Sequence, residues 1–210
     1  MQLLKVIERV AGKSAPGRTP AFAEAHIVKA LETLGAKEPV GRIRLSKTLG
    51  LGEGETRTLI GRLRTEGVIT VSKGGIGLSK LGKKLLSELR TRLSEGLETP
   101  ESSLTVGSHN IAILIKKAAD SVRYGLEQRD AAITAGALGA TTLVFRNNQL
   151  TMPGVSANVF ENIGSIHNML IEKLKPEEGD VVIIGSAEDK RIAEFAAKTA
   201  ALRLLESESE

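Results

Sequence analysis

The chain of 210 residues contains no cysteine, and this absence restricts its chemistry. Without cysteine there is no disulfide and no thiolate ligand for a metal, which fits a reducing cytoplasm. No apolar run approaches the roughly 20 residues that a membrane-spanning helix needs. The N-terminus, MQLLKVIERV, alternates charged with apolar residues and does not resemble a signal peptide. We therefore expect a cytoplasmic protein without a membrane segment.

Sequence patterns typical of catalysis and metal binding are missing as well. The chain lacks G-x-S-x-G, H-E-x-x-H and G-x-G-x-x-G, and no pair of carboxylates is marked for acid–base chemistry. Its three histidines, His26, His109 and His167, do not have the H-x-x-x-H spacing of metal ligands. We expect no metal, no cofactor and no enzymatic activity.

The charged residues are unevenly distributed along the chain. Residues 1–95 carry 18 Lys and Arg against 9 Asp and Glu, a net charge of +9, whereas residues 96–210 carry 11 against 16, a net charge of −5. A basic part joined to an acidic part indicates that the first part binds a polyanion. The polar stretch SEGLETPESS lies where the sign changes. We predict a domain over residues 1–93, a linker over 94–103 and a second domain over 104–210.

The periodicity of the first part predicts mostly helices. Apolar residues at helical spacing predict a helix that begins near Ala23 and ends at Gly35. GRIRL, at 41–45, alternates and predicts a short strand, and LSKTLGL predicts a short helix after it. EGETRTLIGRLRTEG predicts a longer helix that ends at Gly67. VITVS and IGLS predict a hairpin around KGG, and SKLGKKLLSELRTRL predicts a final helix.

Residues 74–84, GGIGLSKLGKK, permit two interpretations. Gly77 to Lys83 fits G-x-x-x-x-G-K, the start of a nucleotide-binding P-loop, but that motif requires Ser or Thr next, where Lys84 stands. The alternative is the turn and return strand of a hairpin, followed by a helix for which Ser79 is the N-cap. The hairpin accounts for more of these residues, and we favour it.

The order helix, strand, helix, helix, hairpin, helix over residues 22–90 resembles a winged helix-turn-helix domain of bacterial and archaeal transcription regulators. The stretch TRTLIGRLRTEGVITVSKGGIGLSKLGKKLL is similar to their recognition helix, wing and following helix. The resemblance implies that this part binds double-stranded DNA, with the long helix in the major groove and the wing beside the phosphate backbone.

Helical geometry predicts which side chains face the DNA. If Leu59, Ile60 and Leu63 face the core, helical geometry points Thr58, Gly61 and Thr65 outward. These three residues are flanked by Arg57, Arg62 and Arg64. An arginine can donate two hydrogen bonds to guanine, and a glycine can let a helix lie deep in the groove or can simply be tolerated at a surface. We predict that DNA is contacted by Arg42, Arg44, Ser46, Lys47, Thr56, Arg57, Thr58, Gly61, Arg62, Arg64, Thr65, Lys73, Lys80 and Lys83, with Lys84 as a further phosphate contact.

The second part predicts alternating strands and helices. Strands are predicted in SLTVGSHNIAILIKKA, TTLVF, QLTMP and DVVIIG, and helices in GLEQRDAAITAGALGA, SIHNMLIEKL and SAEDKRIAEFAAKTAALRLL. The order β-α-β-β-α-β-α predicts a ferredoxin-like (split β-α-β) α/β domain with an extra C-terminal helix, and a three-layer α/β domain is the alternative. Ser186 and Asp189 fit a capping box that opens the last helix. The expected fold class of the chain is α+β.

The whole architecture, and GLEQRDAAITAGALGATTLVF in particular, resembles archaeal winged-helix proteins with a C-terminal domain of uncharacterised function. That family supplies no ligand or reaction to transfer. Arg129 is unfavourable in the first turn of a helix, whereas Asp130 is favourable there, so we expect the arginine to have a specific partner. We predict that His109, Asn110, Arg129 and Asp130 line a site for a small-molecule effector or a subunit contact, with an ordinary surface ion pair as the alternative.

These observations predict a cytoplasmic transcription regulator whose winged helix binds double-stranded DNA and whose second domain senses an effector or dimerises. The amphipathic N-terminal segment, with Leu3, Leu4, Ile7 and Val10, is expected to support a homodimer, because two half-sites require two recognition helices. Two alternatives remain. One is an enzyme with a nucleic-acid-binding winged helix and catalysis in residues 104–205, and the other is a non-catalytic assembly module of the transcription machinery.

Overall fold

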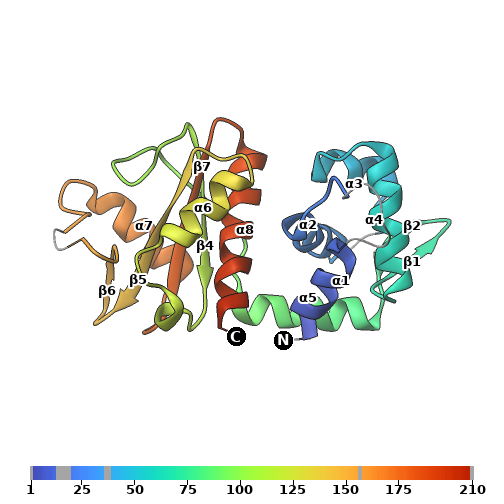
Figure 1. Cartoon of the computed structure of the whole chain (residues 1–210), viewed down its shortest axis with the longest axis horizontal. Helices are drawn as coiled ribbons and strands as arrows, with labels where there is room; N and C mark the ends of the chain where they lie inside the picture. Colours follow the sequence, from blue (N-terminus) through green and yellow to red (C-terminus); the bar gives the residue numbers. More distant parts are fainter. Residues whose placement is uncertain (1, 13–19, 36–38, 156–157, 209–210) are drawn as a thin grey trace. The chain divides into compact units, whose positions relative to one another are not determined.

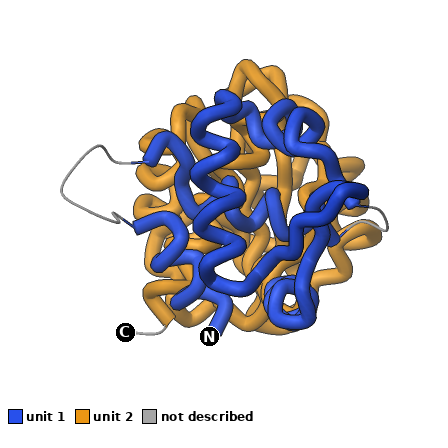
Figure 2. The backbone as a smooth tube through the Cα atoms, turned by 90° about the vertical axis from the view of Figure 1, so that its right-hand side faces the viewer, with its two compact units in different colours: residues 1–89 blue, residues 90–210 orange. Residues whose placement is uncertain are grey.

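The computed structural model describes residues 2–12, 20–35, 39–155 and 158–208, which have a mixed α+β fold. The chain divides into two compact units, residues 1–89 and 90–210 (Figure 2). These described residues form eight α-helices and two sheets, with helices dominating unit 1 and the larger sheet in unit 2 (Figure 1). None of the helices in this part of the chain combines the length and the apolar character needed to cross a bilayer.

Unit 1 consists of four helices, a hairpin and most of a fifth helix within its described residues. In chain order these are α1 (Gln2–Ala11), α2 (Glu24–Leu34), α3 (Arg42–Leu49), α4 (Glu53–Thr65), β1 (Ile69–Ser72), β2 (Gly75–Leu78) and α5 (Lys80–Arg92). Helix α1 packs against α2 and α4, and this packing buries its apolar face. Leu3, Ile7 and Val10 are at most 2% exposed, and Leu4 is half-buried. Leu3, Ile7 and Val10 therefore pack in the core of the chain itself, and the homodimer stays a prediction.

The segment predicted as a strand at 41–45 is the first half of helix α3. Leu45 and Leu49 are fully buried one helical turn apart, whereas Ile43 is 63% exposed. The prediction was wrong because a stretch of five residues with two apolar positions fits both periodicities, and the burial of Leu49 decides for the helix. Only Val40, just before the helix, makes a strand-like bridge, to Ile76 of β2.

The hairpin interpretation of residues 74–84 is confirmed. Strands β1 and β2 are antiparallel, and Ser72 pairs with Gly75 across a two-residue turn. Ser79 is the N-cap of α5, because its Oγ accepts a hydrogen bond from the N–H of Gly82 at 3.0 Å and donates one to the carbonyl of Gly67 at 2.6 Å. A Cβ at Gly82 would lie 2.1 Å from the carbonyl oxygen of Val68, so this glycine permits close packing of α5 on the strand.

Unit 2 is a five-stranded sheet with helices, within its described residues. After the end of α5 its elements are β3 (Leu97–Thr99), β4 (His109–Ile115), the 3-10 helix η1 (Ala119–Ser121), α6 (Leu126–Thr134), β5 (Gly139–Arg146), β6 (Gln149–Thr151), α7 (Gly164–Leu174), β7 (Val181–Ala187) and α8 (Lys190–Ser207). The strand order is β3-β4-β7-β5-β6, and each neighbouring pair is antiparallel. Strands β4 and β5 are therefore parallel to each other, with the last strand, β7, between them.

Helices cover both faces of this sheet. Val182 and Ile184 of β7 pack with Ile166 and Leu170 of α7 in one core, whereas a Cβ at Gly185, on the other face, would touch Ala197 of α8. Helix α6 packs against α8 and β5, so α6 and α8 form one layer and α7 the other (Figure 1). Strands β4 and β7 read IAILI and VVIIGSA and are buried on both faces, which requires a layer of helices on each side.

This arrangement differs from the predicted ferredoxin-like domain and agrees with the three-layer alternative. In a ferredoxin-like sheet the third strand, not the last, lies between the first two, and the helices share one face. Residues 97–99, inside the predicted linker 94–103, form β3 and pair with β4. The N-cap of α8 is Asp189 alone, since Ser186 lies in β7 rather than in a capping box.

Candidate nucleic-acid interface

Helix α4 has one buried face and one face open to solvent. Leu59, Leu63 and Thr56 are fully buried, and Ile60, predicted to face the core, is half-buried. The opposite face of the helix carries Gly54, Arg57, Thr58, Gly61, Arg64 and Thr65, all of them exposed. Gly67, with φ of +69°, ends the helix in the left-handed conformation, as predicted.

Two glycines occupy the outermost line of this open face. Gly54 and Gly61 are seven residues apart, which places them two helical turns apart on one side. A Cβ at either position would meet no heavy atom within 4 Å among the described residues. A glycine within a helix costs up to about 1 kcal/mol relative to alanine, and no contact with another described residue requires either glycine. The strip without side chains therefore lies on the surface of α4.

A three-residue turn, 50–52, connects α3 to α4 and fixes one helix relative to the other. Gly50 adopts φ of +67°, and the hydroxyl of Ser46 donates a hydrogen bond to the carbonyl of Leu51 at 2.7 Å. The hydroxyl of Thr56 donates to the carbonyl of Gly52 at 2.9 Å and is buried. Ser46 and Thr56 were predicted to contact DNA, but the structure places both hydroxyls in the turn, where they satisfy backbone groups.

Arg62 is also held by the protein itself. Its Nη1 donates hydrogen bonds to the carbonyls of Val10 at 2.7 Å and Gly12 at 2.6 Å, at the C-terminal end of α1. Its guanidinium carbon lies 5.4 Å from the centre of the Phe22 ring, within the range of a cation–π contact. A charged group with these partners joins α1 to α4, so Arg62 has a structural role, and its contact with DNA stays a prediction.

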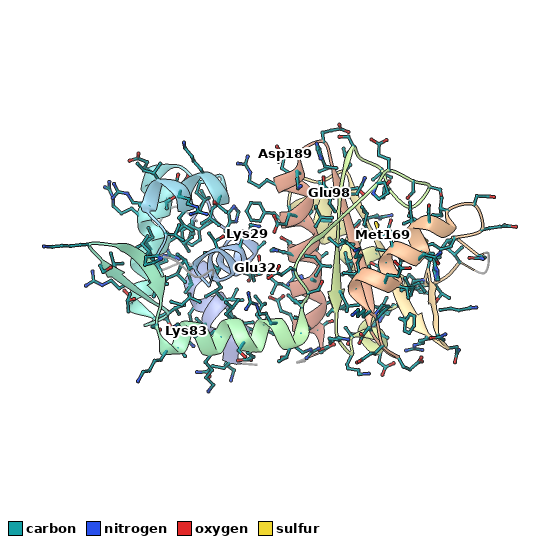
Figure 3. All side chains as sticks on the ribbon, turned by 180° about the vertical axis from the view of Figure 1, so that it is seen from behind. Lys29, Glu32, Lys83, Glu98, Met169 and Asp189 are labelled. Atoms are coloured by element: carbon teal, nitrogen blue, oxygen red, sulfur yellow. The ribbon has the colours of Figure 1, made fainter. Side chains whose placement is uncertain are left out.

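The remaining predicted cations are exposed. Arg57 and Arg64, on α4, make no ion pair or side-chain hydrogen bond to another described residue. The same is true of the exposed cations on α3, the hairpin turn and α5, namely Arg42, Arg44, Lys47, Lys73, Lys80, Lys83 and Lys84. Figure 3 labels Lys83 on α5. These nine exposed side chains give α3, α4, the hairpin turn and α5 of unit 1 a set of positive charges without partners among the described residues.

A hollow of about 440 Å³ opens beside the open face of α4. Thr58, Gly61 and Thr65 form one of its sides, and an ion pair between Arg9 of α1 and Glu66, with a nitrogen–oxygen distance of 2.8 Å, forms another. The two threonine hydroxyls donate to the carbonyls of Gly54 and Gly61 at 3.0 Å. The hollow therefore offers these hydroxyl oxygens on the α4 side, where Gly61 has no side chain, and Arg62 also lines it.

The four residues predicted to form an effector or subunit site in unit 2 are not brought together. Asn110 is buried, and its amide nitrogen donates to the carbonyl of Gly107 at 2.9 Å. It follows the alternation of β4 toward the α7 layer, whereas Arg129 and Asp130 lie on α6 in the other layer. His109, half-buried, pairs with Ala187 of β7.

The charges near the N-terminus of α8 form a separate surface group. Glu98 makes an ion pair with Lys190, and Figure 3 places Glu98 and Asp189 at the same end of unit 2. The hydrogen bond from Lys190, and then its charge, lower the pKa of Glu98. Backbone hydrogen bonds from Ile192 and Arg191 lower the pKa of Asp189. Within the described part of the chain, no three His, Cys, Asp or Glu residues are grouped as metal ligands.

Known proteins match both units. The family model described as "PH0730-like, N-terminal domain" matches residues 29–84, and that described as "Domain of unknown function (DUF4443)" matches residues 106–204. The chain is similar to a solved structure, the hypothetical protein PH0730 from Pyrococcus horikoshii OT3, with 29% identity and a TM-score of 0.72. The similarity covers 90% of this chain and 96% of that one. A search of curated proteins found no match.

These matches confirm the predicted likeness to an archaeal protein whose C-terminal domain has no known function. The matched ranges, 29–84 and 106–204, fall in unit 1 and unit 2 respectively, as the division of the chain would require.

Proposed function

We propose that unit 1 is a winged helix-turn-helix domain that binds double-stranded DNA, and that the chain is a cytoplasmic transcription regulator rather than an enzyme. Helices α3 and α4, joined by a three-residue glycine-containing turn, are the helix-turn-helix pair. Helix α4 is the recognition helix, and β1 and β2 form the wing.

The main support for this proposal is the open face of α4. Gly54 and Gly61 leave a strip without side chains that no contact with another described residue requires, and Arg57 and Arg64 are exposed beside it. A helix with this face can approach the floor of the major groove closely, while an arginine at its side donates two hydrogen bonds to guanine O6 and N7. Two glycines on one line of an exposed helix face lower helix stability, and a close contact with DNA would account for both.

The surrounding cations supply the contacts that position the helix. Lys73 lies in the turn of the wing, and exposed lysines and arginines on α3 and α5 continue the positive surface of unit 1. Contacts of this kind to phosphate oxygens fix the register of a protein on the duplex without reading its sequence. The net charge of +9 over residues 1–95 agrees with this role.

Four arginine variants test the proposal by fluorescence anisotropy on labelled duplexes. Arg57→Ala and Arg64→Ala should each weaken binding about tenfold while leaving the melting temperature unchanged. Arg62→Ala should instead lower the free energy of unfolding by about 2 kcal/mol, because it leaves two carbonyls of α1 without their charged donor. Arg123→Ala, an exposed arginine of unit 2, is the control and should change neither quantity. Wild-type affinity in both α4 variants would refute the assignment of the interface.

A further inference from the structure

Helix α6 in unit 2 leaves two large apolar side chains exposed and buries a glutamine. Gln128 and Ala132, which face the protein, are at most 2% exposed, whereas Leu126 and Ile133 are 51% and 47% exposed. Among the described residues, four of the eight large hydrophobic side chains that are exposed lie between 124 and 138, since Tyr124 and Leu138 flank the helix. An apolar patch of this concentration on a soluble domain marks an interaction surface.

The charged residues on the same face are also exposed. The guanidinium of Arg129 contacts the carboxylate of Asp130 at 3.1 Å, and the two side chains are 50% and 65% exposed. Residues 126, 129, 130 and 133 have the spacing i, i+3, i+4 and i+7, so they form a single stripe on the outside of α6. The stripe reads apolar, positive, negative, apolar.

We propose that this stripe is the contact between two copies of the chain, with α6 packed antiparallel on α6 of the partner about a two-fold axis. With the axis between positions 129 and 130, Leu126 faces the partner's Ile133 and Ile133 faces the partner's Leu126. In the same register Arg129 faces the partner's Asp130, and the reverse contact repeats it. One symmetric register thus matches all four positions, which is the self-complementarity that a two-fold interface requires.

This surface takes the place of the dimer contact predicted for the N-terminal segment, whose apolar side chains are buried in the chain. The inference does not depend on DNA binding, and its test measures molecular mass alone.

Charge reversal in the full chain tests the pairing by sedimentation equilibrium. The wild type should have twice the chain mass of 22.3 kDa at about 100 µM. Arg129→Asp places two like charges opposite each other, as does Asp130→Arg, and each should weaken the dimer at least about tenfold. The double variant Arg129→Asp/Asp130→Arg restores opposite charges in the symmetric register and should recover the dimer. A monomeric wild type, single variants with unchanged mass or a double variant without recovery would each overturn the proposal.

Cysteine cross-linking tests the register, since the natural chain has no cysteine. In the proposed pairing Leu126→Cys/Ile133→Cys brings each new thiol opposite the other thiol of the partner, so oxidation should give a covalent dimer. The two positions are about 10 Å apart along one helix, too far for a disulfide within a chain. Either single variant places its thiols away from each other and should cross-link at least about tenfold more slowly. Equal cross-linking by the single and double variants would contradict the antiparallel register.

Discussion

Gly61→Ala should have opposite effects on the stability of helix α4 and on its binding to DNA. Replacing it with alanine adds a methyl group that meets no heavy atom within 4 Å, so the packing of unit 1 should not change. Because alanine is the better helix former, Gly61→Ala should raise the free energy of unfolding by up to about 1 kcal/mol. The same methyl group would stand between α4 and the base edges, so DNA affinity should fall about tenfold. Urea unfolding and fluorescence anisotropy measure the two effects.

Gly164→Ala is the matched control for this change. Gly164 also has open space around its Cβ direction, but it lies at the start of α7 in unit 2, so its replacement should leave DNA affinity unaltered. A more stable Gly61→Ala protein that binds DNA as tightly as the wild type would show that the open strip on α4 is not the contact surface.

Single residues could be assigned from the sequence only where the relevant neighbour is close along the chain. Helical spacing correctly placed Arg57, Gly61 and Arg64 on the open face of α4. It could not show that Arg62 reaches Val10, because that contact joins positions 52 residues apart. Thr56 and the hydroxyl of Ser46 were misassigned for a related reason, since a polar residue type does not reveal that its hydroxyl closes a turn.

Among whole elements, the junction of the hairpin and α5 gives a clear stability test. Gly82→Ala would place a methyl group 2.1 Å from the backbone oxygen of Val68, which cannot move without disturbing the strand. We expect a loss of about 1–3 kcal/mol in the free energy of unfolding, measured in urea. Gly77→Ala, in β2 with open space around the added atom, should change it far less.

Thermal unfolding of the wild type discriminates the hairpin from a P-loop. A nucleotide bound at residues 77–83 would raise the melting temperature of the wild type by mass action. We expect no shift with Mg²⁺ and ATP, and a shift of several degrees would contradict the hairpin interpretation of these residues.

The N-cap of α8 makes stability depend on pH in acid. Hydrogen bonds from Ile192 and Arg191 hold the pKa of Asp189 below its ordinary value of 3.8. A carboxyl group whose pKa is lower in the folded chain contributes stability that is present above the unfolded pKa and is lost as pH falls through the folded pKa. The melting temperature of the wild type should therefore exceed that of Asp189→Ala at neutral pH, and the difference should shrink below pH 3.8.

The Asp189→Ser variant distinguishes the N-cap hydrogen bonds from the charge of the carboxylate. The serine hydroxyl keeps the cap but does not titrate, so its advantage over Asp189→Ala should be the same across this pH range. If the wild-type advantage were equal at about pH 3 and about pH 7, the carboxylate would not be the source of the effect.

Long elements could be predicted from the sequence, but the arrangement of strands could not. Runs such as those of β7 and α8 have a single periodicity over many residues, and both were located correctly. The segment 41–45 was too short to distinguish strand from helix, and the three residues of β3 were hidden in a polar stretch. The position of β7 between β4 and β5 depends on pairing between distant strands, which no local pattern records.

For the whole molecule, the uneven distribution of charged residues along the chain can be interpreted from the ion pairs that neutralise some of the cations. Several cations of unit 2 have acidic partners, including Lys116, whose ammonium lies 2.9 Å from the buried carboxylate of Asp180. Burial alone would lower the pKa of Lys116, but hydrogen bonds and the charges of Asp180 and Glu177 raise it. The exposed cations of α3, α4, the hairpin turn and α5 make no such pair with another described residue, so they are available to an external polyanion.

Salt dependence measures how many of these cations meet DNA phosphates. If about six phosphates are neutralised, affinity should fall roughly a thousandfold between about 50 and about 200 mM salt. Lys73→Ala should lower affinity for all sequences alike and reduce the slope of log affinity against log salt by about one. Lys173→Ala, an exposed lysine of α7, should leave the slope unchanged. A slope near zero, or one that Lys173→Ala reduces as much as Lys73→Ala does, would mean that the phosphate backbone does not lie along unit 1.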